Sequence, residues 1–250
     1  MEKNNINLRA EVSSENQLLQ ALKRDELRFV YAPVGLLSSD TPKKDKIIAV
    51  PPVFLADCEE ETLQKLKELK AMGFNRAMAH TVGHIPLIQK TEMLLHGGLR
   101  LNIANSAAAD FFADQGFEDI VLSCELTAKR IRALSCKIPF GIAAYGRLPL
   151  MITRRCPINN GKPCNNGRNC GKYLEDRKGE KIRTFCSNTV ELLNPNILTV
   201  ANRLSDFPTV NFFIMRFTDE KNVGNALDSF IKGEKSDGNV TAGLYYRGVE

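Results

Sequence analysis

The stretch KIIAVPPVFLADCEEETLQKLKELKAMGFNRAMAHTV (46–82) places a strand, a helix and a second strand in direct succession. Its two ends are short runs rich in apolar residues, which is typical of buried strands. The middle predicts a helix that ends at Gly73, because four apolar residues recur at helical spacing. These residues are Leu63, Leu66, Leu69 and Met72. Such a stretch predicts a βα unit with parallel strands.

The same alternation runs through most of the chain, at intervals of roughly 20 to 28 residues. Eight or nine strands in 250 residues favour an α/β fold of the (β/α) TIM-like barrel type, as one domain over residues 1–250. An open doubly wound sheet is the alternative, but no G-x-G-x-x-G motif follows the first strand. We predict strands at 8–12, 28–32, 46–52, 76–82, 99–104, 119–125, 139–146, 196–201 and 210–218.

Residues 154–186 interrupt this rhythm and predict an irregular, cysteine-rich insertion within the barrel domain. The segment contains Cys156, Cys164, Cys170 and Cys186. Four thiolates complete either a tetrahedral zinc site or a 4Fe–4S cluster, and the wide spacing suits both. Structural or redox-active thiols are the third reading of this spacing. We therefore expect a metal or cluster site here.

Positive charge accompanies these cysteines. Between residues 154 and 183 there are nine lysines and arginines against three acidic residues. Nearby cations stabilise thiolates and offset the negative charge of a thiolate-bound metal. The same charges would attract an anionic substrate, although a merely solvated loop has this composition too.

Polar residues at the carboxyl ends of the predicted strands are the candidate site residues, because barrel enzymes place their chemistry there. We expect Glu125, Arg147 and Arg216 in catalytic roles, and Asn105, Tyr145 and Arg183 in substrate binding. Each of these residues also has an ordinary structural reading, such as a helix cap at Asn105.

The remaining composition is that of an ordinary globular protein, with a net charge of +5. The N-terminus lacks the apolar core of a signal peptide, and no apolar run of about 18 residues predicts a membrane span. We therefore expect a cytoplasmic protein. Cys58, Cys124 and Cys136 are expected to pack in the core, and His80 with His84 is a weak candidate for a metal pair.

Three motifs resemble peptidase family U32, the collagenase-like proteases. They are LSCELT (122–127), AAYGRLPLMITRRCPI (143–158) and YLEDRKGEKIRTFC (173–186), and the match is to the C-terminal portion of long bacterial members. The ending RFTDE…GLYYRGVE is also similar to the end of those proteins.

This resemblance implies a barrel-like fold and a 4Fe–4S cluster held by Cys156, Cys164, Cys170 and Cys186. Shorter relatives carry another cysteine where Pro149 stands here. Some relatives hydroxylate RNA bases or a quinone precursor without oxygen, with prephenate as an oxygen source. The resemblance therefore implies an Fe–S enzyme with an anionic small-molecule or RNA substrate. It also implies an N-terminal partner region or chain of the same family.

The family name implies a peptidase, although no protease triad, dyad or zinc-protease helix is recognisable. A zinc- or cluster-stapled module that binds RNA or protein without catalysis is the third hypothesis.

Overall fold

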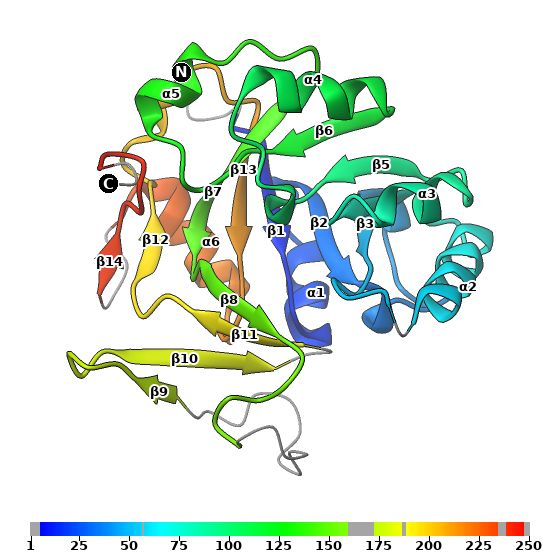
Figure 1. Cartoon of the computed structure of the whole chain (residues 1–250), viewed down its shortest axis with the longest axis horizontal. Coiled ribbons are helices and arrows are strands. Elements are labelled where there is room, and N and C mark those ends of the chain that lie inside the picture. The colour runs from blue at the N-terminus through cyan, green and yellow to red at the C-terminus, as the bar shows by residue number, and fades with distance from the viewer. Residues whose placement is uncertain (1–5, 57, 160–172, 187–188, 235–238, 248–250) are drawn as a thin grey trace.

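The computed structural model describes residues 6–56, 58–159, 173–186, 189–234 and 239–247. Eight parallel strands form a closed barrel at its centre (Figure 1). The ring closes because β13 pairs with both β7 and β1. In order around the ring the strands are β1 (Leu8–Glu11), β2 (Leu27–Pro33), β3 (Ile47–Val50), β4 (Arg76–Ala79), β5 (Leu94–Gly97), β6 (Phe117–Val121), β7 (Phe140–Gly146) and β13 (Phe212–Arg216). The predicted (β/α) barrel is confirmed.

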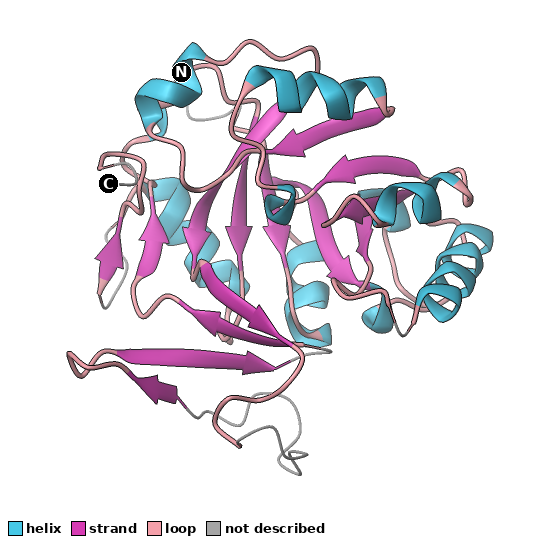
Figure 2. Cartoon of the chain, viewed as in Figure 1, coloured by secondary structure: helices cyan, strands magenta, loops and turns pink. Residues whose placement is uncertain are grey.

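Helices connect these strands and lie around the outside of the barrel (Figure 2). They are α1 (Glu15–Leu22), α2 (Glu59–Ala71), α3 (His84–Gln89), α4 (Ser106–Asp114), α5 (Ala128–Ala133) and α6 (Val223–Lys232). Short 3₁₀ helices occur at Val34–Leu36, Lys44–Lys46, Leu99–Leu101 and Leu204–Asp206.

Local signals in the sequence set several helix ends. The Ser14 hydroxyl accepts a hydrogen bond from the backbone N–H of Gln17, as an N-cap does. Thr127 caps α5 in the same way. Gly73 and Gly116 follow α2 and α4 with φ of +96° and +84°, a conformation that favours glycine. These caps agree with the predicted helices.

A second, antiparallel sheet lies between β7 and β13, where most other units of the barrel have a helix. Its order is β8 (Pro149–Thr153), β11 (Val190–Leu193), β10 (Lys181–Cys186) and β9 (Tyr173–Glu175). Figure 1 shows this small sheet across the end of the barrel to which the arrows of β7 and β13 point. Strand β12 (Ile197–Thr199) then runs antiparallel to β7 and pairs with β14 (Val240–Thr241).

The apolar core has two parts. The larger part lies between the barrel strands and the helices. The smaller part fills the barrel interior with Tyr31, Ile48, Met78, Val121, Phe212 and Ile214. Gly141 makes room for the Phe212 ring, because a Cβ at Gly141 would lie 2.2 Å from that ring. The barrel is therefore a packed core, and ligands reach only its ends.

Two sequence predictions are wrong. The predicted strand at 99–104 is a 3₁₀ helix at Leu99–Leu101 followed by a single β-bridge from Ile103 to Leu122, and the strand of this unit is β5, at Leu94–Gly97. The apolar pattern of β5 was not recognisable because it is interrupted by His96, a polar residue that bonds Asp119 inside the barrel. The segment 154–186 is also not irregular throughout, because β9 and β10 form a hairpin in it.

Candidate functional site

A cavity of about 310 Å³ lies at the carboxyl ends of the barrel strands, beneath the small sheet. We call it the rim cavity. Its barrel side includes Glu11, Pro33, Val50, His80, Arg100 and Arg216, and its small-sheet side includes Phe185, Cys186 and Glu191. This is the end at which barrel enzymes hold their substrates.

A buried chain of ion pairs crosses the rim cavity. Glu191 of β11 accepts hydrogen bonds from Arg100 (Nη2 to Oε1, 2.6 Å) and Arg216 (Nη2 to Oε2, 2.5 Å). Arg216 also donates from Nε to Glu11 Oε1 at 3.0 Å and from Nη1 to the Arg147 carbonyl at 3.1 Å. Burial alone would raise the pKa of Glu191, but Arg216 and Arg100 outweigh it and hold that pKa below its usual range.

Three of the predicted site arginines attach the small sheet to the barrel. Arg216 does so through Glu191. Arg147 donates to the Asn194 carbonyl at 3.1 Å and to the Pro195 carbonyl, both just after β11. Arg183 of β10 pairs with Asp219, just after β13. The structure brings these arginines together, and each is occupied by protein partners.

His80 presents a neutral imidazole to the rim cavity. Burial lowers its pKa well below the usual range, and the charge of Arg100 acts in the same direction. Its Nδ1 is buried and has no hydrogen-bond partner among the described residues. Gly98 lets the ring pack closely, since a Cβ there would lie 2.6 Å from that nitrogen.

His84 has a structural role. Its Nδ1 accepts from the backbone N–H groups of His80 and Thr81 at 3.0 and 3.1 Å, which leaves Nε2 to donate to the Pro52 carbonyl at 2.9 Å. The ring thereby joins the loops after β3 and β4. The described residues contain no group of three His, Cys, Asp or Glu side chains arranged to hold a metal ion.

The two described cysteines of the predicted ligand set leave the same end of the small sheet. Cys186 ends β10 and lines the rim cavity. Thr153 ends β8, and both Thr153 and Cys186 pair with Val190 of the intervening strand. Thr153 and Cys186 are therefore two strand spacings apart, which is about 10 Å. Cys156 follows Thr153 by three residues. Cys164 and Cys170 lie outside the described residues.

Three predicted residues lie away from the rim cavity. Glu125 is exposed in the loop after β6. Asn105 caps α4, accepting from the Ala108 N–H at 2.8 Å. Tyr145 packs against Phe217 and Phe230, and burial raises its pKa to about 12.

Sequence reasoning missed Glu11, Arg100 and Glu191. Glu11 ends the first strand, so the rule that selected Arg216 also applies to it. Arg100 follows β5, whose position was misjudged. Glu191 is on β11, which was not predicted, and a buried glutamate has no distinctive sequence pattern.

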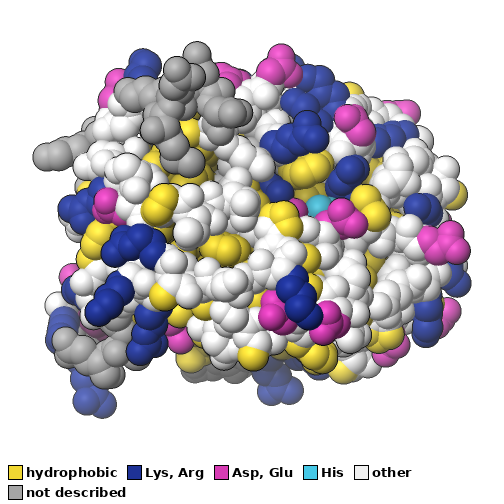
Figure 3. Space-filling model, turned by 90° about the horizontal axis from the view of Figure 1, so that it is seen from above, with side chains coloured by type: hydrophobic (Ala, Val, Ile, Leu, Met, Phe, Trp, Pro, Cys, Tyr) yellow, Lys and Arg dark blue, Asp and Glu magenta, His cyan; other side chains and the backbone are white. Residues whose placement is uncertain are grey.

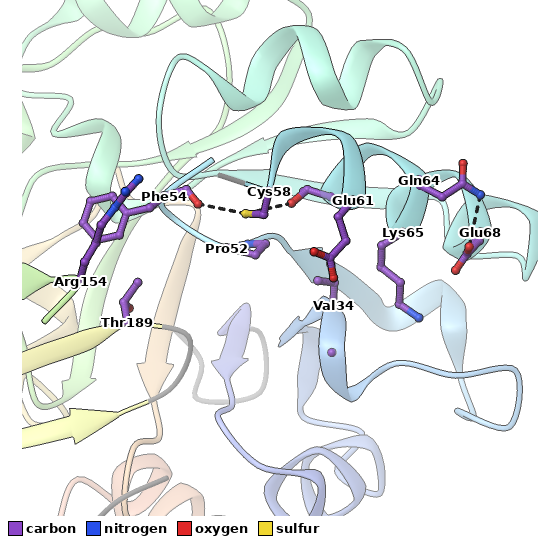
Figure 4. Close-up of a pocket in the computed structure, with 12 residues that line it drawn as sticks. Val34, Pro52, Phe54, Cys58, Glu61, Gln64, Lys65, Glu68, Arg154 and Thr189 are labelled. Carbon is purple, nitrogen blue, oxygen red and sulfur yellow. Dashed lines mark hydrogen bonds between the residues drawn. The ribbon is translucent and has the colours of Figure 1, made fainter. Parts of the chain in front are cut away.

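A second cavity, of about 710 Å³, adjoins the first. This outer groove lies between α2 and the turn at Val34–Leu36 (Figure 4). The two cavities share Val34, Gly35, Pro52 and Thr189.

The remaining surface carries both signs of charge. Figure 3 views the molecule from the side opposite the small sheet, and basic and acidic side chains are interspersed over that face. No described helix is both long and apolar enough to cross a membrane.

The fold and the rim cavity define a (β/α)-barrel protein with its candidate site under an inserted sheet. The model of peptidase family U32 matches residues 43–178, and the chain belongs to this family. Its fold is similar to that of the U32 peptidase Mk0906, with a TM-score of 0.50 and 10% identity over 87% of this chain and 94% of that one.

A second solved structure is the spore cortex-lytic enzyme SleL of Bacillus megaterium QM B1551. It has a TM-score of 0.40 and 11% identity over 96% of this chain and 75% of that one. A search of curated proteins returns no match.

Proposed function

We propose that this chain is an iron–sulfur enzyme that hydroxylates a ring, either an RNA base or a small aromatic compound, without molecular oxygen. The observation that carries the proposal is the position of Cys186, which lines the rim cavity of a family U32 barrel. A cluster bound there would lie beside the substrate position.

The positions of the two described cysteines support a cluster at this place. Cys156 and Cys186 leave one end of the small sheet, and the segment from Cys156 to β9 carries Cys164 and Cys170. The basic residues between 154 and 183 would offset the charge of four thiolates. When bound, a 4Fe–4S cluster supplies one-electron transfer. Zinc is the alternative occupant of the same thiols.

The side chains of the rim cavity would bind and orient the substrate. The neutral His80 is suited to hydrogen-bond an uncharged ring, whereas Arg100 and Arg216 are already paired with acids. An anionic co-substrate such as prephenate would therefore bind these arginines by displacing Glu191. Such an exchange would couple co-substrate binding to the position of the small sheet.

Hydroxylation is tested directly in anaerobic cells that produce the chain. RNA and small-molecule extracts should contain a product heavier by one oxygen atom, which is absent with the Cys186→Ser variant. An RNA that binds in a salt-sensitive manner, with no product of altered mass, would instead favour a non-catalytic binding module.

The second candidate is a peptidase, which the family description favours. Against it, no described histidine is placed as the base of a nucleophile pair. His84 is held by backbone groups, His96 bonds Asp119 inside the barrel, and His80 Nδ1 has no partner. Peptide cleavage that persists after the cluster is removed would support this candidate.

A further inference from the structure

His80 is a buried histidine of the rim cavity whose ring nitrogens have no hydrogen-bond partner among the described residues. It directly follows β4, and only 6% of it is exposed. Its backbone N–H donates to His84 Nδ1 at 3.0 Å, and the preceding carbonyl, of Ala79, accepts from the Gly98 N–H at 2.9 Å. These bonds hold the His80 ring in place before any ligand arrives.

The two ring nitrogens of His80 have different surroundings. Nδ1 is fully buried, and the chain passes close to it, since a Cβ at Gly98 would lie 2.6 Å from Nδ1 and 2.8 Å from the Met78 sulfur. Nδ1 forms no hydrogen bond with that sulfur or with any other described group. Nε2 is not fully buried, and it is therefore the nitrogen that can meet a ligand in the rim cavity.

The surroundings of Nδ1 decide which nitrogen of His80 carries the proton. Burial lowers the pKa of the ring well below its usual range, so the ring is neutral and has one N–H donor and one acceptor. A proton on Nδ1 would leave a buried N–H without an acceptor, and such orphaned donors are rarer in proteins than under-satisfied acceptors. A proton on Nε2 leaves only a lone pair unpaired and directs the N–H toward the cavity.

The rest of the rim cavity favours a flat, uncharged ring beside His80. The charged donors Arg100 and Arg216 already bond Glu191. Phe185 lines the small-sheet side and offers an aromatic face for packing. The volume of about 310 Å³ is at the lower end of the roughly 300–1,000 Å³ of small-molecule sites. A single ring that accepts a hydrogen bond from His80 fits these features.

We propose that His80 is a specificity-determining residue of the rim cavity, and that its Nε2–H donates to a carbonyl oxygen on the substrate ring. A ring with an amino group at that position would place two N–H donors against each other and bind less well. This inference rests on the proposed use of the rim cavity as the substrate site. It adds the kind of ring substituent that the site recognises.

Nitrogen NMR of the anaerobically purified full chain, labelled at histidine, tests the position of the proton. The His80 resonances are identified by their loss in the His80→Gln variant. They should show a protonated Nε2 and an unprotonated Nδ1. A proton on Nδ1 would overturn the inference, whatever activity the protein has.

Two probe compounds test the recognition of a carbonyl oxygen. The first, 1-methyl-2-pyridone, has a ring carbonyl and no N–H group, and toluene is a ring of similar size without polar atoms. In NMR titrations, His80→Leu should weaken pyridone binding relative to toluene binding by about three- to tenfold, because one neutral hydrogen bond is lost. His80→Gln is the matched control, since its amide keeps a donor, and it should retain most of the preference for the pyridone.

The outcomes separate this inference from the proposed reaction. An unchanged ratio of the two affinities in His80→Leu, or no binding of the pyridone by the parent protein, would overturn the role of His80. Absence of a hydroxylated product, with the tautomer and the affinity ratio as expected, would contradict the proposed reaction and leave the role of His80 supported.

Discussion

Replacing Glu191 by Gln tests how the small sheet is attached to the barrel. The carboxylate is buried and bonds both Arg100 and Arg216, and the substitution keeps its volume while removing its charge. Loss of one partner from a buried ion pair costs about 3–5 kcal/mol. Because Gln retains one acceptor oxygen, we expect a loss near the lower end, about 3 kcal/mol.

Thermal unfolding followed by circular dichroism measures this loss. For a chain of this size, 1 kcal/mol lowers Tm by about 2–4 °C, so the expected decrease is about 6–12 °C. Glu11→Gln is the matched control, because its side chain is 24% exposed and pairs with Arg216 alone. That control should lower Tm by no more than about 4 °C.

The pH dependence gives a second readout. The pKa of Glu191 is held below its usual range in the folded protein, so its stabilisation is present above the unfolded value and is lost as pH falls through the folded value. The difference in Tm between the parent and Glu191→Gln should therefore shrink as the pH falls below about 4.3. A Tm of Glu191→Gln within about 2 °C of the parent's at neutral pH would correspond to a loss of about 1 kcal/mol or less. That result would show that the Glu191 ion pairs do not stabilise the attachment of the small sheet to the barrel.

Replacing Cys186 by Ser should remove most of the iron found after anaerobic purification, whereas Cys124→Ser should retain it; equal iron in the two variants would contradict the ligand role. The His80 ring should stay neutral across about pH 5–8, because burial lowers its pKa, and nitrogen NMR of labelled histidine would reveal any titration in that range. Since neutral His80 favours the folded state, its contribution to stability is present above about pH 6.5 and is lost as the pH falls. Gly146→Ala should destabilise the barrel by about 1–3 kcal/mol, because the added Cβ would lie 2.0 Å from the Arg216 carbonyl oxygen at a φ of +109°. Gly35→Ala, with no atom within 4 Å of the added Cβ, is its control in urea unfolding, and equal losses in the two variants would refute the packing argument.

The sequence allowed the barrel to be predicted because its strands and helices carry strong local patterns. The apolar spacing from Leu63 to Leu69 and the glycine at Gly73 are sufficient to define α2. Strand β5 was misplaced because His96, which bonds Asp119 on the neighbouring strand β6, interrupts its apolar run. Such a long-range pairing leaves no mark on the neighbouring residues.

The small sheet was missed for a different reason. Strands β9 and β10 are largely exposed or half-exposed and carry charged residues, and β11, although buried, is only four residues long. None of them therefore shows the sustained alternation of a half-buried strand. One available signal was the turn between β9 and β10. There the Asp176 carboxylate accepts from the N–H groups of Lys178 and Glu180, and Gly179 has a φ of +79°.

The site predictions were guided by strand ends, which located Arg216 and Arg147 but not their partners. Each arginine was expected to face a substrate, yet the structure pairs both with protein groups. Charge type alone does not distinguish an ion pair within the fold from a binding residue. That distinction depends on Glu191, which is 25 residues from Arg216 in the sequence.

Metal analysis of the anaerobically purified protein decides whether the four cysteines hold a 4Fe–4S cluster. We expect a brown protein with about four irons and matching sulfide per chain, and an electron paramagnetic resonance signal of the reduced cluster. A colourless protein with one zinc ion per chain would contradict it.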